Sequence, residues 1–382
     1  MASVTDNSPI TEVARLFLRL GLTAFGGPAA HIGLMEREAV EGRGWMSRAA
    51  FLDLVGACNL LPGPGSTQVA MTLGYRRAGW AGLITAGTCF ILPSMVFTLG
   101  LAWAYVRYGS LPQAQGLLYG AKPVMVAIIV QAIWNLGRTA FRRWPLAVVG
   151  VACFGVALAG APPVAILLAA GALVLGVVWL RESRGRNTRA LAVLPSMLGS
   201  AAAGAATPVG LMPLCLVFLK LGVVVFGSGY VLLAFFKADL VDRLHWITNG
   251  QLLDAVTAGQ VTPGPLFTSA TFIGYLIRGW AGAGVATAAI FLPSFLMAGI
   301  VGALAERIRR SPLASAFLDG VNAAAVALMA FVALALGRAA LMDGWTVALA
   351  VVSLVLLLRF RVNATWVILS GAALGILLHA AG

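Results

Sequence analysis

Two Pro-Gly-Pro motifs interrupt apolar stretches of the chain, at residues 62–64 and 263–265. Proline removes a backbone donor from a helix and glycine adds backbone freedom, so each motif should break a helix. The residues after a break present unpaired N–H groups at a helix N-terminus, and such groups bind anions. Four side chains after the motifs could add donors: Ser66, Thr67, Gln68 and Thr268. The motifs therefore predict an anion site.

Charged residues stand at matching positions before the two motifs. Arg19 and Lys220 each lie inside an apolar run. A cation near the bilayer centre costs about 2.5–3.5 kcal/mol on insertion scales, so we expect both residues to serve the anion site. The alternative is that their long side chains reach an interface. Asp53 and Asp254 begin the interrupted segments, where they could cap a half-helix, pair with a cation or carry a proton, and capping or pairing is the first interpretation.

The composition indicates the environment in which these residues act. Of the 382 residues, 60% are hydrophobic and 10% are charged. Soluble domains carry roughly 25% charged residues, and the apolar runs here approach the roughly 20 residues that span a bilayer. The net charge of +13 fits basic loops on the cytoplasmic side better than nucleic-acid binding. The sequence predicts a multi-pass protein of the cytoplasmic (inner) membrane, surrounded by lipid.

The chain contains one unit twice. LFLRLGLTAFGG at residues 16–27 matches VFLKLGVVVFGS at residues 217–228, at an offset of 201 residues. After the Pro-Gly-Pro motifs the offset becomes 200, and GWAG and LPS recur in that register. A register with one gap over more than a hundred residues indicates two homologous repeats. We place them at residues 11–189 and 209–382, with a connecting segment at 190–208 that could be a further span.

Each repeat has about six hydrophobic segments. In the first repeat we expect them at 13–34, the broken 51–75, 80–106, 116–137, 144–160 and 162–180. In the second they are expected at 209–236, the broken 251–275, 280–304, 316–337, 344–358 and 363–381. The predicted fold class is an all-α polytopic membrane protein with two repeats.

The distribution of basic residues favours inverted repeats. We take the N-terminus as cytoplasmic and the broken segments as spanning. In an inverted second repeat the inside loops then hold seven basic residues: Lys237, Arg243, Arg307, Arg309, Arg310, Arg359 and Arg361. The outside loops hold two, Arg278 and Arg338, whereas a parallel arrangement would reverse the bias. Inverted repeats with matching broken helices are typical of secondary transporters, whose substrates bind at the repeat interface.

Other classes of protein explain the pattern less well. The breaks could be packing kinks alone, and an anion channel would also use broken helices and basic residues. An enzyme would need a nucleophile–base pair or a metal site. The four scattered cysteines and three histidines show no such spacing, so we expect no catalytic residue, metal or other cofactor. Lys122 corresponds to Asn322 in the second repeat, an asymmetry that could matter for substrate handling.

The combined motifs resemble those of the chromate ion transporter family, in its long two-domain form. They are FGGPAAHIGLMEREAV, CNLLPGPGSTQVA and FILPS, with FGSGYVLLAF, GQVTPGPLFTSATFIGY and FLPS as weaker copies. The resemblance covers nearly the whole chain and implies export of chromate and chromate resistance. Sulfate or another small oxyanion is the alternative substrate, and a homodimer is allowed. The second copy departs from the first because Ser228–Gly229 replaces Gly27–Pro28 and no histidine matches His31.

These arguments predict one substrate site shared by both repeats. Its predicted residues in the first repeat are Arg19, Gly26, Gly27, Asn59, Pro62, Gly63, Pro64, Gly65, Ser66, Thr67 and Gln68. Those in the second repeat are Lys220, Gly227, Ser228, Gln260, Pro263, Gly264, Pro265 and Thr268. Asp53 and Asp254 are predicted to serve coupling or pairing. We expect the two breaks to face each other near the bilayer midplane, with Arg19 and Lys220 close by.

Overall fold

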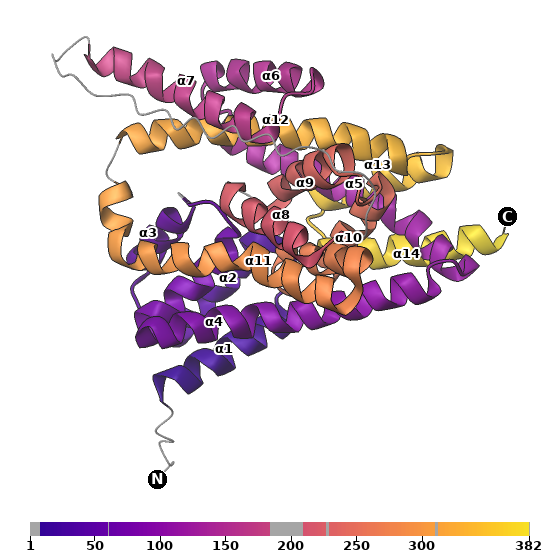
Figure 1. Ribbon diagram of the computed structural model, residues 1–382, viewed down its shortest axis with the longest axis horizontal. Coiled ribbons are helices and arrows are strands. Elements are labelled where there is room, and N and C mark those ends of the chain that lie inside the picture. The colour runs from indigo at the N-terminus through magenta and orange to yellow at the C-terminus, as the bar shows by residue number, and fades with distance from the viewer. Residues whose placement is uncertain (1–7, 60, 184–208, 227–228, 310–311, 382) are drawn as a thin grey trace.

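A computed structural model describes residues 8–59, 61–183, 209–226, 229–309 and 312–381 (Figure 1). This part of the chain is helical and contains no β-strand. The connecting segment 190–208 and two residues of the predicted site, Gly227 and Ser228, lie outside the described residues.

The helices follow the repeat. The first repeat contains α1 (Pro9–Thr23), α2 (Gly27–Glu36), the π-helix η1 (Arg37–Gly42), α3 (Arg48–Cys58), α4 (Gly65–Tyr108), α5 (Pro112–Ala140), α6 (Trp144–Leu158) and α7 (Pro163–Ser183). The second contains α8 (Leu211–Val224), η2 (Gly229–Val231), α9 (Leu232–Phe236), η3 (Lys237–Arg243), α10 (Asn249–Val261), η4 (Leu266–Thr268), α11 (Ser269–Arg309), α12 (Pro312–Ala340), α13 (Gly344–Arg359) and α14 (Ala364–Ala381). Helices α4, α5, α7, α11 and α12 are long and apolar enough to cross a membrane.

Helix α1 and the segment α2–η1 form one hairpin, and α3 and the first part of α4 form a second. Glu12, near the start of α1, accepts a hydrogen bond from Trp45 Nε1 at 3.0 Å and pairs with Arg77 at 2.8 Å. The start of α1, the chain after η1 and residue 77 therefore lie together. The turns at 24–26 and 61–64 lie at the opposite end of these helices. Glycine permits the first turn, because Gly26 has a φ of 105°.

This geometry differs from the expectation that segments 13–34 and 51–75 each cross the membrane. Each segment is broken, as predicted for 51–75, but the break reverses the chain direction, so both ends lie on one side. If neither segment crosses the membrane, two crossings disappear together and the orientation of all later helices is unchanged. A spanning first segment would place Arg37, Arg43 and Arg48 on the side opposite to Arg76 and Arg77. In the hairpin, Arg43 and Arg77 both pair with Glu12, so these basic residues lie on one side.

Helices α4 and α11 each contain a sharp reversal. Residues 78–79 and 278–279 leave the helical conformation, with φ of +61° at Gly79 and +60° at Gly279. A Cβ atom on Gly74 would lie 2.3 Å from the carbonyl oxygen of Gly82. Eight residues of straight helix span about 12 Å, so the chain folds back here, and α4 pairs its first thirteen residues against its long second part.

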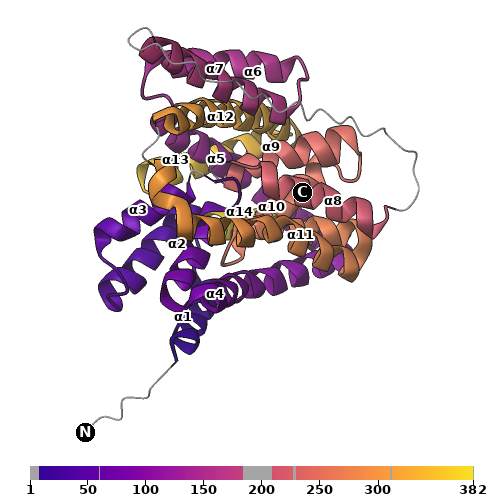
Figure 2. The same ribbon diagram turned by 60° about the vertical axis from the view of Figure 1, so that its left-hand side comes forward.

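The two repeats are interlocked. Helix α5 packs against α13 and α14 of the second repeat, while α12 packs against α6 and α7 of the first (Figure 2). Both contacts are close: a Cβ atom on Gly120 would lie 2.0 Å from the carbonyl oxygen of Gly371, and one on Gly320 would lie 2.3 Å from that of Ala170. Small residues at equivalent positions allow this approach between membrane helices.

Equivalent helices of the two repeats run in opposite directions. The early part of α5 lies beside the chain that follows α12, because the Tyr119 hydroxyl donates to Asp343 Oδ2 at 2.7 Å. The end of α5 and the start of α12 line the same cavity. Helices α5 and α12 are therefore antiparallel, as inverted repeats require.

Candidate functional site

The two Pro-Gly-Pro breaks meet through reciprocal backbone hydrogen bonds between the repeats. The N–H of Gly63 donates to the carbonyl of Val225 at 2.6 Å, and the N–H of Gly264 donates to the carbonyl of Ala24 at 2.9 Å. Each bond joins the Pro-Gly-Pro break of one repeat to the residue that follows the first helix of the other repeat, Ala24 after α1 or Val225 after α8. Both glycines adopt positive φ, 117° and 96°. Broken backbone at membrane depth is thus paired with the other repeat, which removes the cost of leaving it unsatisfied.

Behind the breaks, buried hydroxyl groups differ between the two halves. Ser94 Oγ lies 2.9 Å from Thr268 Oγ1, which also lies 3.3 Å from Thr98 Oγ1. The repeat equivalents of the first pair are Ser294 and Thr67. Both are buried, and neither hydroxyl has a hydrogen-bond partner among the described residues. The buried hydroxyl groups near the break at 62–64 therefore make fewer hydrogen bonds than those near the break at 263–265.

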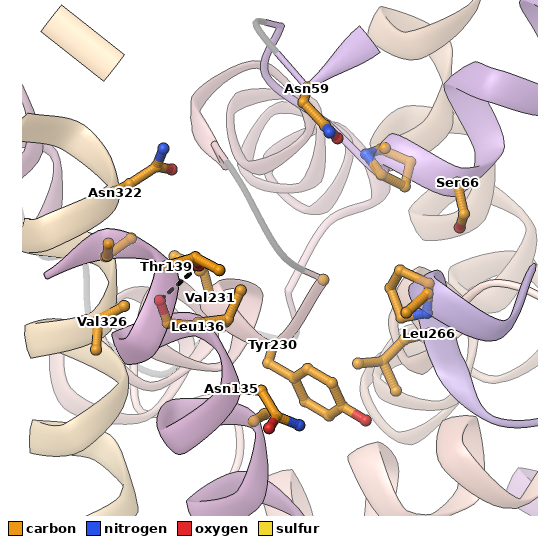
Figure 3. Close-up of a pocket in the computed structure, with 18 of the residues that line it drawn as sticks. Asn59, Ser66, Asn135, Leu136, Thr139, Tyr230, Val231, Leu266, Asn322 and Val326 are labelled. Atoms are coloured by element: carbon orange, nitrogen blue, oxygen red, sulfur yellow. Dashed lines mark hydrogen bonds between the residues drawn. The ribbon is translucent and has the colours of Figure 1, made fainter. Parts of the chain in front are cut away.

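A cavity of about 750 Å³ reaches the breaks from one side of the molecule (Figure 3). Its inner end includes Pro64, Gly65 and Ser66 of one repeat and Pro265 and Leu266 of the other. Its walls come from α5 and α12. Polar wall residues are Gln131, Asn135, Thr139, Ser315, Asp319 and Asn322. In Figure 3, Asn59 and Ser66 lie across the cavity from Asn322 and Asn135.

The cavity can hold a negative charge. Arg142 and Arg143 line it, against the single carboxylate of Asp319 among the described lining residues. Helix α4 begins at Gly65 with no side chain capping its first turn, so its N-terminal N–H groups are available beside Ser66 and Asn59. A helix N-terminus, amide donors and guanidinium groups are the features that bind oxyanions in proteins.

The predicted site residues fall into three sets. Those that line the cavity are Gly26, Asn59, Pro64, Gly65, Ser66 and Pro265. Those that lie at or behind the breaks without lining it are Gly27, Pro62, Gly63, Thr67, Gln68, Gln260, Pro263, Gly264 and Thr268. Among these, Gln68 Nε2 donates to the Pro62 carbonyl at 2.6 Å and so supports the break from inside. The third set is Arg19 and Lys220.

Arg19 and Lys220 do not line the cavity. Arg19 forms an ion pair with Glu38, and Lys220 pairs with Asp239 at 2.7 Å. Their side chains are 51% and 41% exposed. Each cation is held by a carboxylate of its own hairpin, and its predicted role at the breaks stays a prediction.

The two matched aspartates have different surroundings. Asp53 is exposed on α3, whereas Asp254 is buried on α10. Asp254 pairs with Lys122 Nζ at 3.3 Å and accepts a hydrogen bond from the Tyr105 hydroxyl at 3.0 Å. Pairing with a cation was one predicted role of Asp254, although the partner is Lys122. No cluster of His, Cys, Asp or Glu suited to a metal occurs in the described part of the chain.

Sequence reasoning missed the polar stripe on α5. Gln131, Asn135 and Thr139 recur every four residues, which places them on one face of a helix. Such a stripe inside a membrane span indicates a wet or protein-facing surface, and this signal was available in the sequence. Arg142 and Arg143 also line the cavity, and nothing local in the sequence indicates that their loop borders one.

Known proteins share this chain's sequence along most of its length. A family model described as "Chromate transporter" matches residues 11–176 and again residues 212–376. The chromate transport protein of Cupriavidus metallidurans is 35% identical over 96% of this chain and 92% of its own. The probable chromate transport protein of Synechococcus elongatus is 33% identical over 91% of this chain and 89% of its own.

More distant relatives also span the chain. An uncharacterized transporter of Methanocaldococcus jannaschii is 24% identical over 98% of this chain and 95% of its own. No solved structure matches the chain. With two family matches, apolar helices of membrane length and relatives that are transporters rather than enzymes, this multi-pass membrane protein belongs to the chromate transporter family.

Proposed function

We propose that the protein is a secondary transporter that exports chromate across the cytoplasmic membrane and thereby confers chromate resistance. The relatives named above supply chromate as the substrate. The cavity supplies the supporting observation: it brings Arg142, Arg143, amide side chains and the uncapped start of α4 to one space at the repeat interface. Substrate sites of inverted-repeat transporters lie at that interface.

The cavity opens on the side from which export would start. Arg142 and Arg143 stand at the α5–α6 turn, and Arg76 and Arg77 follow the Pro-Gly-Pro hairpin. The positive-inside rule assigns such basic loops to the cytoplasm. A cavity that opens there admits anions from inside the cell. The basic lining also raises the local anion concentration.

Energetics permit export driven by voltage alone. A divalent anion that leaves a cell with a negative interior gains about 2.3 kcal/mol per charge per 100 mV, or roughly 4.6 kcal/mol in total. At about 1.36 kcal/mol per tenfold change, this sustains a concentration ratio on the order of 10³. Coupling to a second ion would add to this gradient.

Flux in liposomes tests the proposal. Purified protein in liposomes should carry chromate at a rate that saturates with concentration and rises when an imposed voltage drives anions outward through the protein. Protein-free liposomes give the background. A rate that never saturates would indicate a channel, sulfate flux without chromate flux would assign a different oxyanion, and a rate that ignores voltage would exclude electrogenic export.

A further inference from the structure

The cavity wall formed by α5 has a repeat-equivalent surface on α12, on the opposite side of the molecule. The repeat offset relates the cavity-lining Ile128, Ala132 and Leu136 of α5 to Leu328, Val332 and Leu336 of α12. Leu336 is fully buried, whereas Leu136 is half-buried; the residues of the other two pairs are buried on both sides. The polar stripe of α5 also has apolar equivalents on α12, which are Phe331, Ala335 and Ala339. One route to the breaks is open and polar. Its counterpart, where α12 carries apolar residues and Leu336 is buried, is called the closed side.

A buried ionic cluster lies on the closed side. Lys122 comes from the first half of α5, Asp254 from α10 and Tyr105 from the far end of α4. Asp254 is 4% exposed and contacts both partners through different oxygens, with Lys122 Nζ at 3.3 Å and the Tyr105 hydroxyl at 3.0 Å. The Lys122 side chain is 23% exposed. The cluster therefore combines one fully buried charge with one that remains within reach of solvent.

The cluster joins the two repeats. Lys122 and Tyr105 belong to the first repeat and Asp254 to the second. Alternating access in inverted-repeat transporters proceeds by movement of one repeat unit or bundle against another around a fixed site. Opening the closed side would separate the helices that carry these residues, whereas a pair within one rigid unit would stay intact.

The equivalent positions on the open side already differ. Asn322, which corresponds to Lys122, lines the cavity, and Asp53, which corresponds to Asp254, is exposed. The closed side thus carries a lysine where the open side carries a neutral amide. If the closed side opened to the same extent, Lys122 would line the new cavity.

We propose that Lys122, Asp254 and Tyr105 form the gate that closes the far side of the transport path, and that the transported anion replaces Asp254 as the partner of Lys122 when this gate opens. The exchange leaves no step at which the lysine is buried without a counter-charge, a state that is strongly unfavourable. The exchange of partners rests on the proposed function, whereas the gate concerns only conformation.

Cysteine labelling tests the gate without any substrate. In a background that lacks the four native cysteines, Leu136→Cys reports the open cavity and Leu336→Cys reports its buried equivalent. With an otherwise unchanged chain, a charged, membrane-impermeant thiol reagent should label Leu136→Cys from the cavity side and leave Leu336→Cys protected. Adding Asp254→Asn should make Leu336→Cys react from the opposite side at least about tenfold faster, equal to about 1.4 kcal/mol in the closed–open equilibrium.

A matched control separates gating from general loosening. Glu36→Gln removes the Glu36–Arg48 ion pair, which joins α2 to α3 on the cavity side. This control should leave Leu336→Cys protected. Protection that persists in Asp254→Asn, at normal membrane abundance, would overturn the gate.

Transport assays test the exchange of partners. Lys122→Gln combined with Asp254→Asn leaves two amides that can still close the gate, so Leu336→Cys should stay protected while chromate transport falls at least about tenfold. Lys122→Arg should retain more transport than Lys122→Gln. Wild-type transport by the double variant would show that Lys122 does not bind the anion. Failure of chromate flux in the unsubstituted protein, with the labelling shift intact, would instead reject the proposed substrate and leave the gate standing.

Discussion

At the scale of single residues, the site offers neutral donors at its inner end and cations toward its mouth. Asn59 and Ser66 stand at the inner end, next to the start of α4, while Arg142 and Arg143 lie at the α5–α6 turn. Neutral donors bind an anion without holding it as tightly as a buried cation would. Release on the far side requires such a balance.

Asn59→Asp is predicted to weaken chromate binding. The change keeps the size of the side chain and adds a negative charge that faces the anion, so the KM for chromate should rise at least about tenfold, or about 1.4 kcal/mol. Asn59→Ala is the matched control. It removes the donor without adding charge and should raise the KM by a smaller factor. Equal KM values for the two variants would place the anion elsewhere.

Arg19 provides the second prediction at this scale. Its partner is Glu38, and the pair is partly exposed, so its contribution to stability should be about 0–1 kcal/mol. Arg19→Gln should therefore cause little change in the KM for chromate and a small loss of thermal stability. Glu38→Gln should also leave the KM nearly unchanged but cost more stability, because it removes the Glu38–Arg43 ion pair at 2.6 Å as well. A large rise in KM for Arg19→Gln alone would restore the role in anion binding that the sequence suggested.

At the scale of elements, the Pro-Gly-Pro turns depend on their central glycines. Gly63 and Gly264 combine positive φ with crowding. A Cβ atom would lie 2.8 Å from Gln68 Nε2 at Gly63 and 2.8 Å from Ser94 Cβ at Gly264. The reciprocal hydrogen bonds to Val225 and Ala24 leave little room for the turns to move.

Gly63→Ala and Gly264→Ala are predicted to lower both thermal stability and transport. The left-handed conformation costs roughly 1–2 kcal/mol for alanine, and the close contacts add to that cost. Gly56→Ala is the control, because a Cβ atom there meets nothing within 4 Å inside helix α3. Melting of the detergent-solubilised protein should show a clear loss for the first two variants only. Unchanged melting in all three would mean that the turns adapt and are not rigid.

At the scale of the whole molecule, the hairpins change the expected topology. The loop at residues 43–46 lies with Glu12 and Arg77, on the side from which the cavity opens. If the first segment crossed the membrane, this loop would lie on the opposite side.

Accessibility labelling separates the two topologies. In a cysteine-free background, Gly44→Cys and Arg143→Cys should both react from the cytoplasmic side, and Met342→Cys should react from the outside as the control. Met342 is a suitable reporter because it is exposed and lies just after the C-terminal end of α12. Reaction of Gly44→Cys from the outside would show that the first segment spans the membrane.

The sequence by itself determined the class of protein and its internal symmetry. Apolar composition requires a membrane, and repeated motifs at a fixed offset require two copies of one fold, so the prediction of an all-helical membrane protein with two repeats is confirmed. The breaks at residues 62–64 and 263–265 were also predictable, because proline and glycine act on their own backbone. The predicted role of these residues in substrate binding stays a prediction.

Only the tertiary structure decided what each break and each charge contacts. A proline-glycine pair shows that a helix ends, but the direction of the next helix depends on what packs around it, so the hairpins could not be foreseen. Arg19 and Lys220 were recognisable as costly cations, yet Glu38 and Asp239 are distant in sequence and become partners only when the hairpins close. The cavity and the Lys122–Asp254 ion pair depend on contacts between the two repeats, which the sequence of neither repeat shows on its own.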